Sequence, residues 1–408
     1  MSWPEVSRME SRLEFIRLAS AEGANVSALC RRFAVSRKTG HKWLARHRAG
    51  GGAADQPRRP ASSPGRTLAA VEAAVLALRA EHPSWGGRKL RRRLLDLAGG
   101  KDRDGAQQDG AQRDVPAAST VTAILARNGC LGLGGAAAPA TGRFEHDRPN
   151  ALWQMDFKGH FALPASAPAN APAALRCHPL TLLDDHSRYA VCLHACADEG
   201  TGTVRDRLVA VFRRYGLPER MNMDNGSPWG SGPGQPWTPL TVWLTRLGVG
   251  ISHSRPYHPQ TNGKAERFHR TLKRDVLFGR SFDGLPACQA AFDDFRETYN
   301  AHRPHEALGL AVPASRYQAS PRNYPEALAP VEYDPADQVR RVQQGGWVSF
   351  RGHDLRLPHA LAGQHVALRP TTTDGLWTAV FIRHTLAQLD LRNTAPTQKP
   401  VTYVPEHV

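Results

Sequence analysis

Apolar residues near the N-terminus recur at helical spacing and predict three short helices. The first helix has its apolar positions at i, i+4 and i+7, namely Met9, Leu13 and Ile16. The second has them at i, i+3, i+4 and i+7, namely Val26, Leu29, Cys30 and Phe33. Ser36 can cap a third helix, which supplies Trp43 and Leu44 to the core. The pattern predicts a compact three-helix module over residues 1–48.

The third of these helices is basic on the side away from its apolar residues. Basic pairs four residues apart share that side, namely Arg37 with His41 and Lys38 with Lys42. For any single helix a solvated face is the commoner explanation. Here, however, residues 1–66 hold 13 Lys/Arg against 5 Asp/Glu. A basic helix that follows a compact one suits the DNA major groove. We therefore expect a helix-turn-helix domain that contacts DNA through these four residues.

A second helical module is expected over residues 68–143, after a linker at 49–67 that is rich in Gly, Pro, Ser and Arg. Helical patterns cover 68–81 and 87–97, and a further helix has Ser119 as its cap and Asn128-Gly129 as its end. The polar stretch 99–116 is predicted to be a surface insertion. The module resembles a second helix-turn-helix, although residues 67–148 hold only 12 Lys/Arg against 9 Asp/Glu.

From about residue 150 the pattern changes to alternating strands and helices. Strands are predicted at 152–161, 220–224 and 250–254, with a hairpin over 180–197 that turns near His186-Ser187. Helices are predicted at 204–215, 239–247, 263–276 and 289–302. This order predicts an α/β domain with a mixed sheet flanked by helices. Beyond a Pro-rich stretch at 313–336, short strands separated by Gly-containing turns predict a small β-barrel over 337–408.

Composition narrows the class of protein. The chain has 408 residues, which favours two to four domains, and a formal charge of +16, which favours a polyanionic partner. Hydrophobic residues at 41% exclude wholesale disorder. No run of about 18 apolar residues and no signal-peptide core occurs, so we expect a soluble, non-exported protein. The six cysteines form no CxxC pair, which favours reduced thiols in a cytosolic compartment.

Three acidic residues of the central region occupy positions that packing explains poorly. Asp156 lies mid-strand between apolar neighbours, Asp224 ends a short strand, and Glu266 lies on a helix opposite its apolar stripe. Taken singly, a turn residue or a surface ion pair is the commoner explanation. Taken together, three carboxylates repel one another unless cations neutralise them, and Mg²⁺ prefers carboxylates and water. Two such ions can activate a nucleophile and stabilise the leaving oxygen of a phosphodiester.

Four segments, LWQMDFKGHF, LLDDHSRY, MDNGSPW and SRPYHPQTNGKAERFHRTLKRD, resemble the integrase core of bacterial insertion-sequence transposases. The resemblance covers residues 144–318 and is strongest to the IS481-like group, which is close to IS3-like transposases and more distantly similar to retroviral integrases. It implies an RNase H-like fold and metal-dependent DNA strand cleavage and strand transfer at transposon ends.

The resemblance also assigns residues. Asp156 matches the family's first catalytic Asp, Asp224 the second, and Glu266 the catalytic Glu, and together they would hold Mg²⁺, with Mn²⁺ as a substitute. Asp224 and Glu266 are 41 residues apart in intervening sequence, which is more than usual. The surplus is expected in the Gly/Pro-rich loop Trp229–Trp237. Asp185 is expected to be structural rather than a metal ligand.

The segment around Glu266 is strongly basic, with six Lys/Arg between residues 255 and 274. A solubilising helix is the alternative to a DNA-binding one, but next to a metal carboxylate we favour phosphate contacts. The expected contacts are Arg255, Lys264, Arg267, Arg270, Lys273 and Arg274, with Tyr257, His258, Gln260 and Asn262 on the preceding loop.

Two other ligand classes are not favoured. Cys177-His178 and the alternating Cys192, His194 and Cys196 could suggest zinc, but small buried residues beside a hairpin explain them better. No P-loop motif occurs, so ATP dependence is not indicated.

The sequence therefore predicts a multidomain DDE transposase with helix-turn-helix modules, an RNase H-like core and a C-terminal β-barrel. Its expected partners are double-stranded DNA, as terminal inverted repeats and target, and further copies of itself, at least a dimer on DNA. The expected location is the bacterial cytoplasm, at the nucleoid. Two alternatives remain open: a catalytically inactive or domesticated DNA-binding regulator, and a nuclease or viral-type integrase without transposon function.

Overall fold

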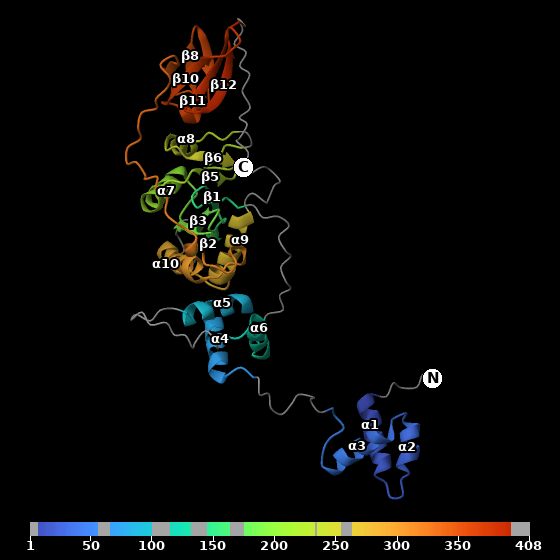
Figure 1. Cartoon of the computed structure of the whole chain (residues 1–408). Coiled ribbons are helices and arrows are strands. Elements are labelled where there is room, and N and C mark those ends of the chain that lie inside the picture. The colour runs from blue at the N-terminus through green and yellow to red at the C-terminus, as the bar shows by residue number, and fades with distance from the viewer. Residues whose placement is uncertain are drawn as a thin grey trace, which may run out of the picture. The chain divides into compact units, whose positions relative to one another are not determined.

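The computed structural model describes residues 7–55, 66–99, 115–131, 145–163, 175–232, 235–253 and 263–392 (Figure 1). The chain divides into two compact units, residues 1–66 and residues 67–408. Within the described ranges, each helix is too short or too polar to span a membrane.

The first unit is a three-helix module. Its helices are α1 (Arg8–Ala19), α2 (Val26–Arg32) and α3 (Arg37–Arg48). The predicted cap is confirmed, because the Ser36 hydroxyl accepts a hydrogen bond from the Thr39 amide at 3.1 Å. The buried core includes Cys30, Trp43 and Leu44, also as predicted.

The buried face of α1 differs from the predicted one. Met9 and Leu13 are 51% and 53% exposed, so placing them on the buried face was wrong. The helix buries Phe15, Ile16 and Ala19 instead. The reason is a close helix–helix contact, in which Gly40 of α3 leaves room for the Phe15 ring. A Cβ on Gly40 would lie 2.9 Å from that ring.

Three further helices open the second unit, namely α4 (Ala69–Glu81), α5 (Gly87–Ala98) and α6 (Ala118–Arg127). They share a core that includes Trp85, Leu90 and Ile124. The prediction of Ser119 as the cap was wrong, because the N-cap of α6 is Ala117, two residues earlier. The predicted end at Asn128-Gly129 is confirmed, with Gly129 at φ +68°. Most of the predicted insertion 99–116 lies outside the described residues.

A mixed sheet forms the centre of the second unit, as predicted. Its strands are β1 (Leu152–Phe157), β2 (Phe161–Ala162), β3 (Arg176–Asp184), β4 (Ala190–Cys196), β5 (Arg220–Met223) and β6 (Gly250–His253). The spatial order is β4-β3-β1-β5-β6, with β2 also paired to β3. Strand β1 is antiparallel to β3 and parallel to β5.

The first predicted strand, 152–161, is in fact two strands. The chain leaves β1 after Phe157 and turns at Gly159, which has φ +82°, before β2 begins at Phe161. The predicted hairpin is confirmed, with its turn between Asp184 and Ala190, although β3 already begins at Arg176.

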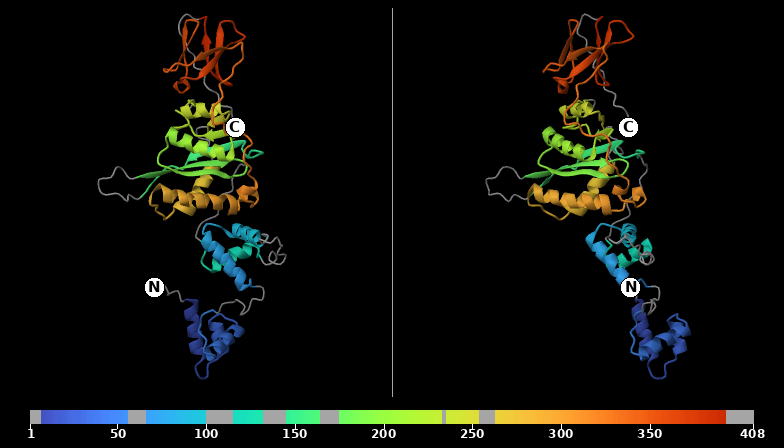
Figure 2. Two further views of the ribbon diagram at one scale, coloured as in Figure 1. Left: turned by 90° about the vertical axis from the view of Figure 1, so that its left-hand side faces the viewer. Right: turned by 60° about the vertical axis from the view of Figure 1, so that its left-hand side comes forward.

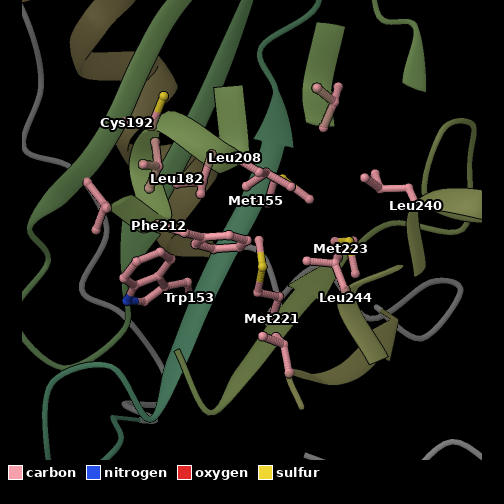
Figure 3. Packing of buried hydrophobic residues seen from close by; sticks show 14 of the residues in the cluster. Trp153, Met155, Leu182, Cys192, Leu208, Phe212, Met221, Met223, Leu240 and Leu244 are labelled. Carbon is pink, nitrogen blue, oxygen red and sulfur yellow. The ribbon is translucent and has the colours of Figure 1, made fainter. Parts of the chain in front are cut away.

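Helices cover both faces of the sheet (Figure 2). One face packs against α7 (Thr201–Tyr215) and α8 (Pro239–Arg246), and Figure 3 shows this core around Trp153, Met155 and Phe212. The other face packs against α9 (Gly263–Leu272) and α10 (Gly284–Glu297). Helix α10 thus begins five residues before the predicted start at 289. Each of the last two helices continues into a π-helical turn, η3 (Lys273–Leu277) and η4 (Thr298–His302), and the 3-10 turns η5 (Glu306–Leu308) and η6 (Pro313–Ser315) follow.

The C-terminal part is antiparallel β structure around one core. A four-stranded sheet has the order β12-β11-β10-β7, and β8 and β9 form a separate hairpin. The strands are β7 (Gln338–Arg341), β8 (Trp347–Phe350), β9 (His353–Arg356), β10 (His365–Pro370), β11 (Leu376–Phe381) and β12 (His384–Asp390), with the 3-10 turn η7 (His359–Leu361) between β9 and β10. Over the described residues these strands form two sheets rather than the single closed barrel that we expected.

Two adjacent glycines test how tightly α5 packs on α6. A Cβ on Gly87 would lie 2.8 Å from the Ala118 carbonyl oxygen, whereas a Cβ on Gly86 would meet nothing within 4 Å. We expect Gly87→Ala to lower the local free energy of unfolding of α4–α6 by about 1–3 kcal/mol, the cost of overpacking. Gly86→Ser should not lower it, since Gly86 is the N-cap of α5 and Ser is a good cap. Amide hydrogen exchange of peptides from these helices measures both, and equal protection in the two variants would contradict the packing.

Candidate active site

Asp156 lies near the end of the central strand β1. Its cross-strand partner on β3 is Thr181, whose hydroxyl donates a hydrogen bond to the Asp156 carbonyl oxygen at 2.8 Å. The same hydroxyl lies 2.8 Å from Nε2 of His269 on α9. The Asp156 carboxylate is 24% exposed, with Oδ2 4.0 Å from Nδ1 of His269. Asp156 therefore points to the face of the sheet that α9 covers.

Asp224 follows the parallel neighbour β5. Gln154 pairs with Asn222, so two residues further along each strand Asp156 and Asp224 come level at the same sheet edge. The carboxyl ends of parallel strands are the usual site of ligand binding in such sheets. Asp224 Oδ1 accepts a hydrogen bond from the Gly226 amide at 2.9 Å, and the Asp224 carbonyl lies 2.7 Å from Nδ1 of His253 on β6. These contacts hold the exposed Asp224 side chain at the end of its strand.

Glu266 lies in the first turn of α9. The helix buries Ala265, Phe268 and Leu272 against the sheet, which leaves Glu266 exposed. Burial, together with the negative charges of Asp224 and Glu266, raises the pKa of Asp156 to about 7. The fold thus brings the three carboxylates within electrostatic reach of one another.

This donor set fits a hard divalent cation. A carboxyl group whose pKa is raised by burial and by two like charges is stabilised as an anion when a cation binds beside it. Oxygen-only ligands at the end of a sheet match the preference of Mg²⁺. Asp156, Asp224 and Glu266 are therefore the residues that would hold such an ion.

His269 was not singled out by the sequence, although it lies one helical turn after Glu266. Burial, followed by the charge of Lys158, lowers the pKa of His269 to about 4. The imidazole is therefore neutral near pH 7 and links α9 to β3 through Thr181. The spacing of three residues from Glu266 is the signal that could have found it.

A third aspartate, Asp185, ties α9 to the turn of the hairpin. It is buried and accepts hydrogen bonds from the His146 amide at 2.9 Å and from Gln154 Nε2 at 3.0 Å. Lys264 of α9, two residues before Glu266, donates its ammonium group to the same carboxylate. Burial alone would raise the pKa of Asp185, but the charge and hydrogen bond of Lys264 and the bonds of His146 outweigh burial and lower it. Asp185 is thus already neutralised within the chain, unlike Asp156.

The other predicted DNA contacts of this segment are exposed where the structure describes them. They are Arg267, Arg270, Lys273 and Arg274. Arg274 also pairs with Asp275, its Nε lying 2.9 Å from Oδ1. Arg255, Tyr257, His258, Gln260 and Asn262 lie outside the described residues.

On α3 of the first unit, the four predicted DNA-binding residues share the exposed surface, namely Arg37, Lys38, His41 and Lys42. Nε of Arg37 donates to the Ser27 hydroxyl at 2.8 Å, which links the start of α3 to α2. The buried Trp43 and Leu44 are on the opposite side. The basic surface is therefore available for a partner.

The cysteines that could suggest zinc lie mainly in the core. Cys192 and Cys196 are buried among apolar side chains, and Cys177 Sγ lies 3.6 Å from Cys288 Sγ on α10. His194, which lies between Cys192 and Cys196 on β4, is half-buried.

Comparison with protein-family models matches most of the chain in five segments. Models described as integrase core domain match residues 146–259 and 247–313. A model of the IS481 family transposase C-terminal domain matches residues 337–397. Homeodomain-like domains, both of the helix-turn-helix type, match residues 7–57 and 39–125.

The curated relatives include proteins of insertion elements and of viruses. An uncharacterized 39.2 kDa protein of insertion element IS476 from Xanthomonas euvesicatoria is 30% identical over 41% of this chain and 44% of its own length. An IS407 protein from Burkholderia multivorans is 28% identical over 44% of this chain and 60% of its own length. The Pro-Pol polyprotein of simian foamy virus type 1 is 26% identical over 32% of this chain and 11% of its own length. The matches thus span less than two thirds of each of these relatives.

Solved structures of retroviral integrases are similar at low identity. The catalytic core domain of HTLV-2 integrase in complex with magnesium covers 42% of this chain and 99% of its own, at 16% identity and a TM-score of 0.31. The core domain of BIV integrase covers 41% and 92%, at 19% identity and a TM-score of 0.30.

Helix-turn-helix, integrase-core and IS481-type C-terminal domains follow one another along this sequence. The chain is therefore similar to integrase-core transposases through its centre, and to the IS481 family in its C-terminal segment.

Proposed function

We propose that the protein is a DDE transposase, which cleaves DNA strands at the ends of an insertion sequence and joins them to target DNA. The observation that carries the proposal is the gathering of Asp156, Asp224 and Glu266, two at one sheet edge and one on the adjoining helix, with the pKa of Asp156 raised to about 7 by burial and by the other two charges. A purely DNA-binding regulator has no need to keep three repelling carboxylates together.

The three carboxylates would hold Mg²⁺, or Mn²⁺ in its place. When bound, the ions supply activation of the attacking hydroxyl and stabilisation of charge on the phosphoryl oxygens. The protein itself positions the ligands: β1 and β5 fix the two aspartates, and Lys264, held by Asp185, fixes the turn of α9 that carries Glu266. No covalent protein nucleophile is needed for this transfer.

DNA would be held in two places. The exposed cations Arg267 and Arg270 of α9, and Lys273 at the start of η3, suit phosphates beside the cleaved bond. The basic surface of α3 suits the major groove of the terminal inverted repeats. Because both ends of an element must be cut together, we infer an oligomer on DNA, at least a dimer, acting in the bacterial cytoplasm.

Removing one metal ligand tests the proposed activity. Asp156→Asn should reduce Mg²⁺-dependent nicking of a duplex that carries the element's end by about 100-fold or more, because the metal contributes several kcal/mol of charge stabilisation. Binding of the same duplex, measured by fluorescence anisotropy, should stay within about twofold. Asp206→Asn on the exposed side of α7 is the matched control and should nick normally. Unchanged nicking by Asp156→Asn would contradict the catalytic assignment, and no nicking by the unsubstituted protein would point to the inactive-regulator alternative.

Substitutions of two cationic residues of α9 distinguish a residue that positions Glu266 from one that contacts DNA. Lys264→Met leaves the buried Asp185 without its ion-pair partner, which costs about 3 kcal/mol for a buried pair and loosens the turn that carries Glu266. We expect it to lower kcat about tenfold or more with little change in KM for DNA. Arg267→Ala, on the exposed side, should raise KM and leave kcat near normal.

Lys264→Arg is the rescue variant, because a guanidinium can still pair with the Asp185 carboxylate. Single-turnover and steady-state nicking assays measure the separate effects on kcat and on KM. A rise in KM alone for Lys264→Met would instead assign Lys264 to DNA binding, as its sequence position first indicated.

A further inference from the structure

Two histidines and a glutamate come together just beyond the end of β1, near enough to Asp156 for the charge of the glutamate, Glu199, to raise the pKa of Asp156. His178 lies on β3, His160 on the turn between β1 and β2, and Glu199 on the loop before α7. One ligand atom from each lies within 4.8 Å of the other two. Among the described residues this is the one such group of His, Cys, Asp and Glu side chains.

Strand register explains why these residues meet. Phe161 pairs with Cys177, so continuing that antiparallel register puts His160 opposite His178. On its other side His178 pairs with Cys196, and Glu199 follows three residues later. The three residues are distant in sequence, but the backbone holds them at one place.

The group is on the opposite face from Asp156. Thr181 is the cross-strand partner of Asp156, and His178 is three residues before Thr181, so alternation turns His178 to the other face of the sheet. That face is the one covered by α7, whose start follows Glu199. The group thus lies on the other face of the sheet from the proposed carboxylate centre and shares no ligand with it, although the charge of Glu199 reaches Asp156.

The side chains are partly organised already. His178 Nδ1 lies 2.9 Å from Glu199 Oε1, and the rings of His160 and His178 have their centroids 5.2 Å apart. Tetrahedral zinc, with bonds of about 2.0–2.2 Å, needs ligand atoms about 3.3–3.6 Å apart. A shift on the order of 1 Å, chiefly of the exposed His160, would give that spacing.

The donor chemistry selects the type of ion. Two imidazoles and one carboxylate suit Zn²⁺ and neighbouring transition ions, whereas Mg²⁺ prefers oxygen ligands. Three protein ligands leave a fourth position for water. One residue opposes binding: the Arg176 guanidinium contacts Nε2 of His160 and must move away, which its exposed position allows.

We propose that His160, His178 and Glu199 form a zinc site that joins the turn after β1 to the loop before α7. It differs from the proposed Mg²⁺ site in its ligands, its ion and its face of the sheet. If His178 and Glu199 formed only an ion pair, His160 would not be needed for metal binding. The proposal therefore differs from that alternative in what it predicts for substitutions of His160.

Cobalt(II) is the probe, because its d–d absorption bands are intense when nitrogen and oxygen ligands bind it in four-coordinate, tetrahedral geometry. The full chain, freed of metal with a chelator, is titrated with Co²⁺ in an Asp156→Asn, Glu266→Gln background, which weakens the carboxylate centre. We expect one equivalent to bind with intense d–d bands, and Zn²⁺ to displace it. Binding is measured without DNA, so the result does not depend on transposase activity.

Substitutions identify the ligands. His160→Gln and His178→Gln should each weaken Co²⁺ binding at least about tenfold. Arg176→Ala should tighten it, since a competing cation is removed. His194→Gln is the matched control, because His194 is half-buried on the neighbouring strand, opposite Leu180, and should bind normally.

The exposed His160 keeps the test decisive even where His178→Gln fails to fold, which circular dichroism detects. Absence of the d–d bands in the starting background would overturn the proposal. Unchanged affinity in His160→Gln would overturn it as well, and would leave His178 and Glu199 as an ordinary ion pair.

Discussion

The pairing of β1 with two unlike neighbours is the constraint on which the proposed active site depends. On one side β1 is parallel to β5, and on the other it is antiparallel to β3. The parallel register brings Asp156 level with Asp224 at the carboxyl ends of both strands, where the bonds between β1 and β5 stop at Gln154. The antiparallel bonds continue to Phe157 and keep β1 in place beyond that point. Strand pairing therefore sets the positions of the two aspartates, and the Thr181 hydroxyl and the Gly226 amide add hydrogen bonds to Asp156 and Asp224.

Asp185 and Asp156, two aspartates of the same domain, differ in how the protein compensates their negative charge. Asp185 is the more buried of the two, yet its pKa is lowered, because Lys264 and His146 supply charge and hydrogen bonds that outweigh burial. Asp156 has no such cation among the influences on it, and its pKa rises to about 7. The protein thus neutralises one buried carboxylate with its own side chains. The Asp156 carboxylate has no such cationic partner among the described residues, so its ionised form is unfavourable until a cation binds beside it. This difference separates a structural aspartate from one suited to bind a metal ion.

Local patterns predicted much of this arrangement. Alternating apolar positions and turn residues gave the order of strands and helices, and an acidic residue inside an apolar strand drew attention to Asp156. What failed depended on contacts between distant segments. Met9 and Leu13 fit a helical repeat, but the face that α1 buries is chosen by Gly40 of another helix. The basic residues around Lys264 indicated a DNA contact, and only the folded hairpin shows that the Lys264 ammonium group reaches the Asp185 carboxylate.

The Gly/Pro-rich loop in which we expect the surplus residues between Asp224 and Glu266 is anchored at both ends. Trp229, five residues after Asp224, is 2% exposed and stacks on Phe157 with ring centroids 5.5 Å apart. Phe157 is the neighbour of Asp156, so the start of the loop is packed under the strand that carries the first aspartate. Trp237 at the far end packs against Phe381 of β11, at 5.9 Å between centroids, and α8 begins two residues later. Because both ends of the loop are anchored, additional residues between the tryptophans lengthen the loop without moving either carboxylate, since loop closure costs little free energy per added residue.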